Sequence, residues 1–230
     1  MLVDTTADPV NPEKAIRYFR RKLKLTDDEW QELEDQNNDL AFRLAGIADI
    51  DVIEQTWSAL DKAIEQGTDF EEFKSDVAQS LTDAWGGSVA NPGHRLETIF
   101  RTNTITAYQA GHHEQAMRQK DDRMYGMLDV VEDDATSEIC SDLDDQIGGV
   151  ALPIDDPALQ AAWPPNHFNC RSNIITLTED EANEQGIGEG PDPDDLDIDE
   201  DFRGPPGADG LPDPEEYGEL EDIVRDFLDE

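Results

Sequence analysis

An excess of acidic side chains runs along the whole of this chain and limits how it can fold. The 230 residues include 56 Asp and Glu but only 17 Lys and Arg, which gives a net charge of -39. Hydrophobic residues make up 37% of the chain, below the usual share in globular domains. Carboxylate repulsion opposes compaction, so any core must be built from apolar stripes that lie between the acids.

This charge has three interpretations. The chain could be a disordered acidic protein, or a folded protein with an acidic tail that binds a basic partner. It could also be adapted to molar salt, where screening is short-ranged and carboxylates keep a protein soluble. The acids are spread along the chain, Asp outnumbers Glu, and Arg outnumbers Lys. We therefore favour adaptation to high salt.

The same charge argues against a general nucleic-acid-binding surface, because such surfaces neutralise phosphates with Lys and Arg. The exception is one basic patch, which runs from Arg17 to Lys24. No apolar run approaches the roughly 20 residues of a membrane span, and the N-terminus lacks a secretory signal pattern. We expect no membrane partner, and we expect the protein to be made and used inside a cell or a particle.

The first part of the chain is predicted to be helical, with residues 1–10 as a flexible arm and residues 11–87 as a helical region. Apolar residues recur at near-helical spacing from residue 12 onward, and the first stripe comprises Ile16, Phe19, Leu23 and Leu25. Further on, Asp49 or Asp51 is expected to cap one helix and Thr68 or Asp69 the next. Glycines are expected to end these helices.

Residues 92–178 predict a second domain. A long helix should run from Pro92 or His94 to about Lys120, followed by three short strand-like pieces separated by glycines and prolines. These pieces are Met124–Val131, Val150–Leu152 and Ile174–Leu177. The predicted fold class is α+β and mainly helical, with a helical N-terminal half, a long central helix and a small, irregular β-containing knuckle.

The composition changes again after residue 178. Residues 179–213 are rich in Asp, Gly and Pro, and we expect them to be a disordered acidic linker. Residues 214–230 carry apolar residues on one face of a short amphipathic helix, which should dock on a partner or on the body of the chain. The residues of this face are Tyr217, Leu220, Ile223, Val224, Phe227 and Leu228.

A metal-binding pattern lies within the knuckle. His167 and Cys170 form a His-x-x-Cys pair directly after Pro164-Pro165, and Cys140 could add a third ligand from across the sheet. Imidazole and thiolate groups at this spacing are typical zinc ligands. The two cysteines are also able to form a single disulfide, although a reducing cytoplasm would oppose it.

The segment from Arg95 to Thr178 resembles the phage Mu F-like head morphogenesis family of minor capsid proteins. The matching residues follow the order and spacing of the family pattern, and they are Ile99, Arg101, Thr102, Asp133, Thr136, Cys140, Pro164, Pro165, His167, Cys170 and Arg171. Ser137 and Ser172 stand where the family pattern has cysteines. A tetrahedral structural zinc needs a fourth ligand, which Asp133, another acid, His112 or His113 would supply. The alternative is a knuckle held by packing, hydrogen bonds or a disulfide.

The resemblance implies a structural protein of a tailed virus, located inside the head or at the portal vertex. Its partners would be the portal protein or the major capsid protein, with a local contact to packaged DNA through the Arg17–Lys24 patch. It would assist head assembly or genome delivery, in the virion and earlier in the host cytoplasm, and the charge suggests a haloarchaeal host. The alternatives are a metal-dependent nuclease or toxin-like enzyme that uses Cys140, His167 and Cys170, and an assembly factor that is not retained in the virion. We expect no enzymatic activity.

Overall fold

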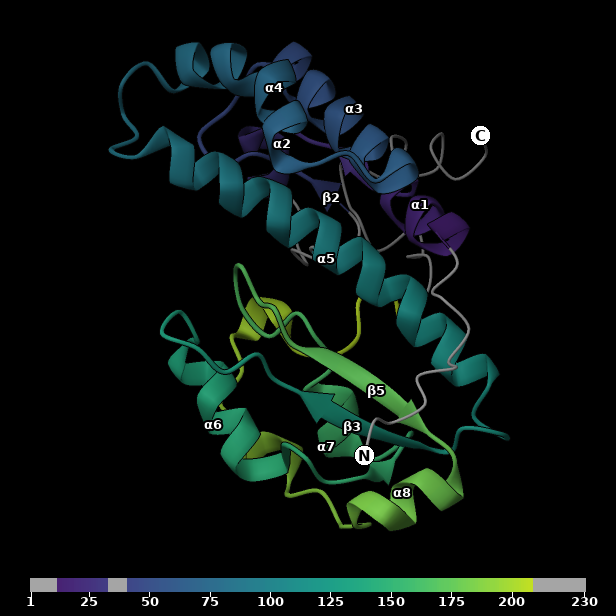
Figure 1. Cartoon of the computed structure of the whole chain (residues 1–230). Helices are drawn as coiled ribbons and strands as arrows, with labels where there is room; N and C mark the ends of the chain where they lie inside the picture. Colours follow the sequence, from purple (N-terminus) through teal and green to yellow (C-terminus); the bar gives the residue numbers. More distant parts are fainter. Residues whose placement is uncertain (1–11, 33–40, 209–230) are drawn as a thin grey trace. The chain divides into compact units, whose positions relative to one another are not determined.

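The computed structural model describes residues 12–32 and 41–208 (Figure 1). The predicted arm at residues 1–10 and the predicted docking helix at residues 214–230 lie outside this part of the chain. The described residues divide into two compact units. The first, called here the helical unit, consists mainly of Ile16–Thr104, and the second, called the knuckle unit, consists mainly of Ile105–Ala208.

The helical unit is built around two long helices, α3 (Ile50–Gln66) and α4 (Phe70–Trp85), which pack against each other. Both begin at an aspartate, because the carboxylates of Asp49 and Asp69 accept hydrogen bonds from backbone amides in the first turn. Glycines at positive φ end both helices, Gly67 at 69° and Gly86 at 54°. The predicted glycine ends are confirmed, and the open choices of N-cap are settled.

The start of the helical unit differs from the prediction. Helix α1 (Pro12–Arg20) ends before Leu23 and Leu25, and Leu23–Lys24 forms a short strand, β1. This strand pairs in parallel with β2 (Ala41–Phe42). Leu23 and Leu25 are buried while Lys24 between them is exposed, so this stretch follows the two-residue period of a strand. A short helix, α2 (Asp27–Glu32), follows β1.

The predicted long helix is present as α5 (Pro92–Arg118). Its first half belongs to the helical unit, where Phe100 packs against Phe70 and Phe73 with ring centroids 5.7 and 5.2 Å apart. Its second half belongs to the knuckle unit, because the two units divide between Thr104 and Ile105. The compact units therefore do not follow the predicted boundary near residue 92.

The knuckle unit contains a three-stranded antiparallel sheet with strand order β4-β3-β5 (Figure 1). The central strand β3 (Tyr125–Asp129) pairs along its whole length with β5 (Asn173–Leu177), and β4 (Leu152–Pro153) covers the other edge. All three strands lie within or next to the predicted strand segments. Helices α6 (Glu138–Ile147) and α7 (Pro157–Ala161) pack on β3.

One face of this sheet forms the core of the knuckle unit. Leu128 of β3 and Ile174 of β5 point into it, and Trp163 is its largest fully buried side chain. Gly126 leaves no room for a side chain on this face, since a Cβ there would come within 2.7 Å of Leu159 Cδ2. Helix α6 adds further apolar side chains, and these are Leu143 and Ile147.

The acidic segment after residue 178 departs from its prediction, because residues 179–208 are folded against the knuckle unit. Thr178 and Glu181 form a capping box that starts α8 (Glu179–Gln185). Two single turns follow, η1 (Pro193–Asp195) and η2 (Glu200–Phe202). Leu196 and Ile198 are 4% and 7% exposed and belong to the core of the unit. The prediction of a disordered linker was wrong here, because two apolar residues anchor this otherwise acidic segment.

Backbone hydrogen bonds fix part of this acidic segment to the rest of the unit. We call this part, residues 186–204, the strap. Near its start, Gly188 N donates to Ala151 O, and Ala151 N donates to Gly186 O. At its end, Gly204 N donates to Ala161 O at 3.1 Å.

Among the residues that the structure describes, no helix is long and apolar enough to cross a membrane.

Candidate metal centre

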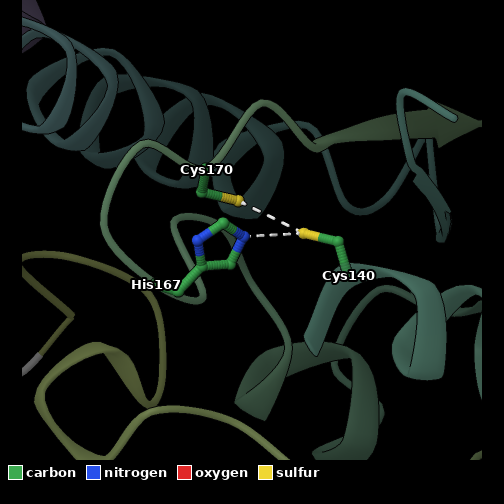
Figure 2. A group of neighbouring side chains, drawn as sticks. All are labelled: Cys140, His167 and Cys170. Carbon is green, nitrogen blue, oxygen red and sulfur yellow. Dashed lines mark hydrogen bonds between the residues drawn. The ribbon is translucent and has the colours of Figure 1, made fainter. Parts of the chain in front are cut away.

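Three side chains of the knuckle unit converge on one point, as the sequence predicted for Cys140, His167 and Cys170 (Figure 2). Cys140 lies in the first turn of α6, while His167 and Cys170 lie in the loop that precedes β5. Cys140 Sγ is 3.0 Å from His167 Nε2 and 3.9 Å from Cys170 Sγ. All three ligand atoms lie within 4.8 Å of one another.

Two serines surround Cys140. Ser137 is the N-cap of α6, where its Oγ accepts from Cys140 N at 3.1 Å, and the same hydroxyl lies 2.8 Å from His167 Nε2. On the other side, the buried Ser172 Oγ lies 3.2 Å from Cys140 Sγ. From the sequence alone, these two serines were notable only because they stand where the family pattern has cysteines. The structure places both serines beside the cluster.

The loop that carries His167 and Cys170 is anchored at its start by buried residues. Pro164 and Pro165 are buried and joined by a cis peptide bond. His167 Nδ1 lies 2.7 Å from Phe168 O, an acceptor, so this nitrogen carries the proton in the neutral ring. His167 Nε2 is then the ring nitrogen that faces the sulfur atoms, and it is the one that would bind a metal.

Three residues of the family pattern form a clasp between the two loops of the site. Asp133 and Arg171 make a two-pronged ion pair with both N···O distances at 2.6 Å. Thr136 closes the turn after Asp133, because its Oγ accepts from Asp133 N and donates to Val131 O, each at 2.7 Å. Asp133 is thus paired with Arg171 and is not part of the Cys-His-Cys group, so the structure does not place it as the fourth ligand.

Hydrogen bonding inside the cluster shifts the pKa values of the two thiols in opposite directions. The bond from Cys170, together with those from His167, Ser172 and Ser137, outweighs burial and lowers the pKa of Cys140 to about 4. The same contact with Cys140, reinforced by burial, raises the pKa of Cys170. Burial lowers the pKa of His167, but the hydrogen bond and charge of Cys140, together with Phe168 O and the charge of Asp199, outweigh burial and raise it. Cys140 is therefore the sulfur that carries negative charge.

The geometry is compatible with a zinc ion. Two sulfur ligands of a tetrahedral zinc lie about 3.8 Å apart, as follows from Zn–S bonds of about 2.3 Å, and the two cysteines here are 3.9 Å apart. A sulfur and an imidazole nitrogen on the same ion would lie about 3.5 Å apart, so the 3.0 Å contact would have to widen slightly. The residues present thus supply three ligands of the kind that zinc prefers.

The other histidines proposed as fourth ligands lie elsewhere in the knuckle unit. His112 and His113 of α5 pack against Trp163, with ring centroids 5.6 and 4.7 Å from it. His113 Nε2 bonds to Gln160 Oε1 at 2.9 Å. Burial lowers the pKa of His112 to about 4 and also lowers that of His113, so both rings are neutral near pH 7. They form part of the wall of the core and do not join the ligand group.

The remaining predicted residues lie in the helical unit. Arg101 of α5 pairs with Glu97 one turn earlier at 2.8 Å, and Thr102 follows it on the same helix. In the basic patch, Arg20 is held by Asp61 and Glu65, at 2.7 and 3.2 Å. Its two lysines lie over aromatic rings, Lys22 over Tyr18 and Lys24 over Trp57. Part of the patch is therefore engaged within the unit.

Known proteins resemble this chain in sequence. The family described as "Phage Mu protein F like protein" matches residues 54–175, more than half of the chain. The Mu-like prophage FluMu F protein of Haemophilus influenzae is 30% identical over 168 residues, which cover 69% of this chain and 40% of that protein. The putative capsid assembly protein F of Escherichia phage Mu is 29% identical over 192 residues, covering 76% of this chain and 42% of that protein. No solved structure matches the chain.

The chain spans about two fifths of the length of these curated relatives. The matched residues include Cys140, His167 and Cys170 as well as the clasp residues Asp133 and Arg171. The family match thus covers the whole ligand group, most of the helical unit, and the three-stranded sheet of the knuckle unit except the last residues of β5. The chain belongs to the Phage Mu protein F-like family.

Proposed function

We propose that this protein is a structural component of a tailed-virus head, located at the portal vertex or in the capsid interior. The observation that carries the proposal is the family match over residues 54–175, together with a relative named as a putative capsid assembly protein. The protein would bind the portal protein or the major capsid protein and assist head assembly or genome delivery. The basic patch would contribute a local contact with packaged DNA.

The architecture of the knuckle supports a structural role for the Cys-His-Cys group. Both cysteines are only 4% exposed, and the clasp ties the segment before α6 to the loop that carries Cys170. A hydrolytic metal needs an open position that substrate can reach and a general base beside it. Asp133 or Glu138 could act as that base, and Asp133 already holds Arg171. These features favour a structural centre over the nuclease or toxin-like alternative.

The cofactor that we propose for this centre is one structural zinc ion held by Cys140, His167 and Cys170. Zinc would hold the start of α6 and the loop before β5 together. The ion pair of Asp133 and Arg171 joins the same two segments next to the ligand group. Metal analysis of the purified chain should find about one zinc per chain. Cys170→Ser should lose most of that zinc, and His113→Gln, at a histidine outside the group, should retain it. Equal zinc contents in the two variants would contradict this assignment.

The segment at residues 214–230 is proposed to dock on a partner through its apolar face, with Ile223, Phe227 and Leu228 at its centre. The acid excess is proposed to suit a virus whose host grows in high salt. Neither proposal depends on the metal. Deleting residues 214–230 should reduce incorporation of the protein into heads, whereas replacing Glu215 and Glu216 by Gln, which keeps the apolar face, should not.

Mass spectrometry of purified particles tests the proposed function directly. A head component should be present in mature particles at a constant ratio to the portal protein. Immunogold labelling or particle reconstruction would then place it at the vertex or in the interior. If the protein is found in assembly intermediates but not in mature particles, it is an assembly factor that is not retained, and the proposal is wrong.

A further inference from the structure

Cys140 and Cys170 are the only two cysteines in the chain, and they face each other. Their sulfur atoms are 3.9 Å apart and point toward one another (Figure 2). A disulfide needs a sulfur separation of about 2.05 Å, so a movement of under 2 Å would join them. Each of the two other positions of the cluster that the family fills with cysteine carries a serine here, so no third sulfur competes for either thiol.

The backbones that carry the two sulfurs are held in place independently of any metal. The cap of α6 fixes Cys140, because Ser137 Oγ accepts from its backbone N–H. The turn before Cys170 is closed by a bond from Cys170 N to His167 O at 3.3 Å. The clasp between Asp133 and Arg171 joins the two segments. Each thiol therefore meets the other at a high effective concentration, which favours an internal bond over bonds between chains.

We propose that the Cys140–Cys170 pair is a disulfide-forming site whose closure is an alternative to metal binding. A small disulfide is the oxidant: the Cys140 thiolate attacks one of its sulfur atoms, the S–S bond breaks, and one small thiolate leaves. The Cys170 thiolate then attacks Cys140 Sγ and displaces the second small thiolate. Two protein thiols lose two protons and two electrons in total, and the small disulfide is reduced to two thiols.

Closure would link the site to the redox state of its surroundings. Zinc needs thiolate ligands, and a disulfide removes both at once. In a reducing cytoplasm the pair stays open and is able to hold metal, whereas outside the cell it closes. Either state joins the start of α6 to the loop before β5. The closure does not rest on the proposed zinc ion; only the exchange between the two states does.

The experiment uses the full chain, stripped of metal with a chelator and incubated with excess cystamine, a small disulfide. Intact mass, alkylation of free thiols after denaturation, and peptide mapping without reduction are the readouts. We expect both thiols to be lost, the mass to fall by two hydrogens, and one cross-linked peptide pair that contains Cys140 and Cys170. The variants Cys140→Ser and Cys170→Ser should each carry a stable cysteamine adduct instead. Adducts on both cysteines of the unaltered chain, or disulfides formed only between chains, would overturn the proposal.

A second arm of the experiment separates this inference from the proposed zinc. Zinc added before cystamine should slow closure about tenfold or more, because a metal-bound thiolate is a poor nucleophile. If closure occurs at the same rate with zinc present, the exchange between the two states is wrong while the disulfide stands. If metal analysis finds zinc but the metal-free chain does not close, the disulfide is wrong while the zinc centre stands.

Discussion

Replacing Ile198 by alanine should destabilise the knuckle unit strongly, because the strap contributes to its core. Ile198 is 7% exposed and belongs to the core formed around Leu128 and Trp163. A buried Ile→Ala substitution removes three methylene-sized groups and leaves a cavity, at a cost of about 2–4 kcal/mol. A loss of this size would be a large part of the stability of a single domain.

The strap provides its own control in a second isoleucine. Ile187 is 45% exposed, and its pairing with Ala151 is made by the backbone and survives truncation of the side chain. Ile187→Ala should therefore cost only about 1 kcal/mol, in proportion to the smaller area that it buries. The two substitutions remove the same atoms, so the difference between them measures burial alone.

Native-state hydrogen exchange followed by mass spectrometry is the appropriate assay, because it reports on the knuckle unit separately from the helical unit. Amides of β3, β5 and α6 should exchange much faster in Ile198→Ala, by a factor of about 30 or more for each 2 kcal/mol lost, while those of α3 and α4 should change little. If Ile198→Ala and Ile187→Ala shift β3 and β5 equally, the strap is not part of the core, and the interpretation of residues 186–204 is wrong.

Three further predictions test other parts of the molecule. Because burial lowers the pKa of His112 to about 4, from the ordinary value near 6.5, the unfolded chain binds more protons between those values. His112 should therefore cost no stability above about pH 6.5 and roughly 3 kcal/mol by pH 4. Urea denaturation at a series of pH values gives the free energy of unfolding, and its dependence on pH in this range should become weaker in His112→Phe. An unchanged pH dependence would contradict the assignment. Gly126→Ala should destabilise by about 1–3 kcal/mol, because its Cβ would meet Leu159 and Ile154 at 2.7 and 3.0 Å; Gly93→Ala, whose nearest neighbour would be 3.8 Å away, should be neutral or stabilising in the same thermal melts, and equal effects would count against the packing argument. Lowering the salt from molar to ~0.1 M should lower the melting temperature, because the carboxylates of a chain with net charge -39 then repel one another with less screening; a melting temperature that does not move with salt would exclude adaptation to high salt as the reason for the charge.

The ligand group could be predicted from sequence because short-range spacing decided most of it. His167 and Cys170 lie three residues apart after two prolines, so any compact turn brings them together. Cys140 was a weaker inference, since thirty residues separate it from Cys170 and only the predicted sheet could bring the two together. The pattern did not reveal what Asp133 does. A carboxylate near two thiols suggests a ligand, and only the structure shows that Arg171 takes both of its oxygens.

The short strands β1 and β2 show a different limit of sequence reasoning. Ile16, Phe19 and Leu23 fit a helical stripe as well as they fit a helix followed by a strand, because the two periods coincide over a few residues. The choice is made by a partner distant in the sequence: Leu23 pairs with Ala41, and Leu25 N then donates to Phe42 O at 3.1 Å. Local pattern contains no information about this pairing, so the end of α1 could not be predicted from the first 25 residues alone.

The strap shows why composition misleads most in a chain of this charge. A segment is expected to be disordered when it lacks enough apolar area to offset the entropy of ordering, and the strap has one of the most acidic compositions in the protein. Its order depends on a few anchors that averages conceal: Leu196 and Ile198 in the core, Phe202 against Phe168 at 4.8 Å, and backbone bonds at both ends. The carboxylates between these anchors cost little because they point to solvent, where salt screens them. In such a chain the apolar residues should be weighed one by one, since Leu196 and Ile198 alone hold several acidic neighbours in place.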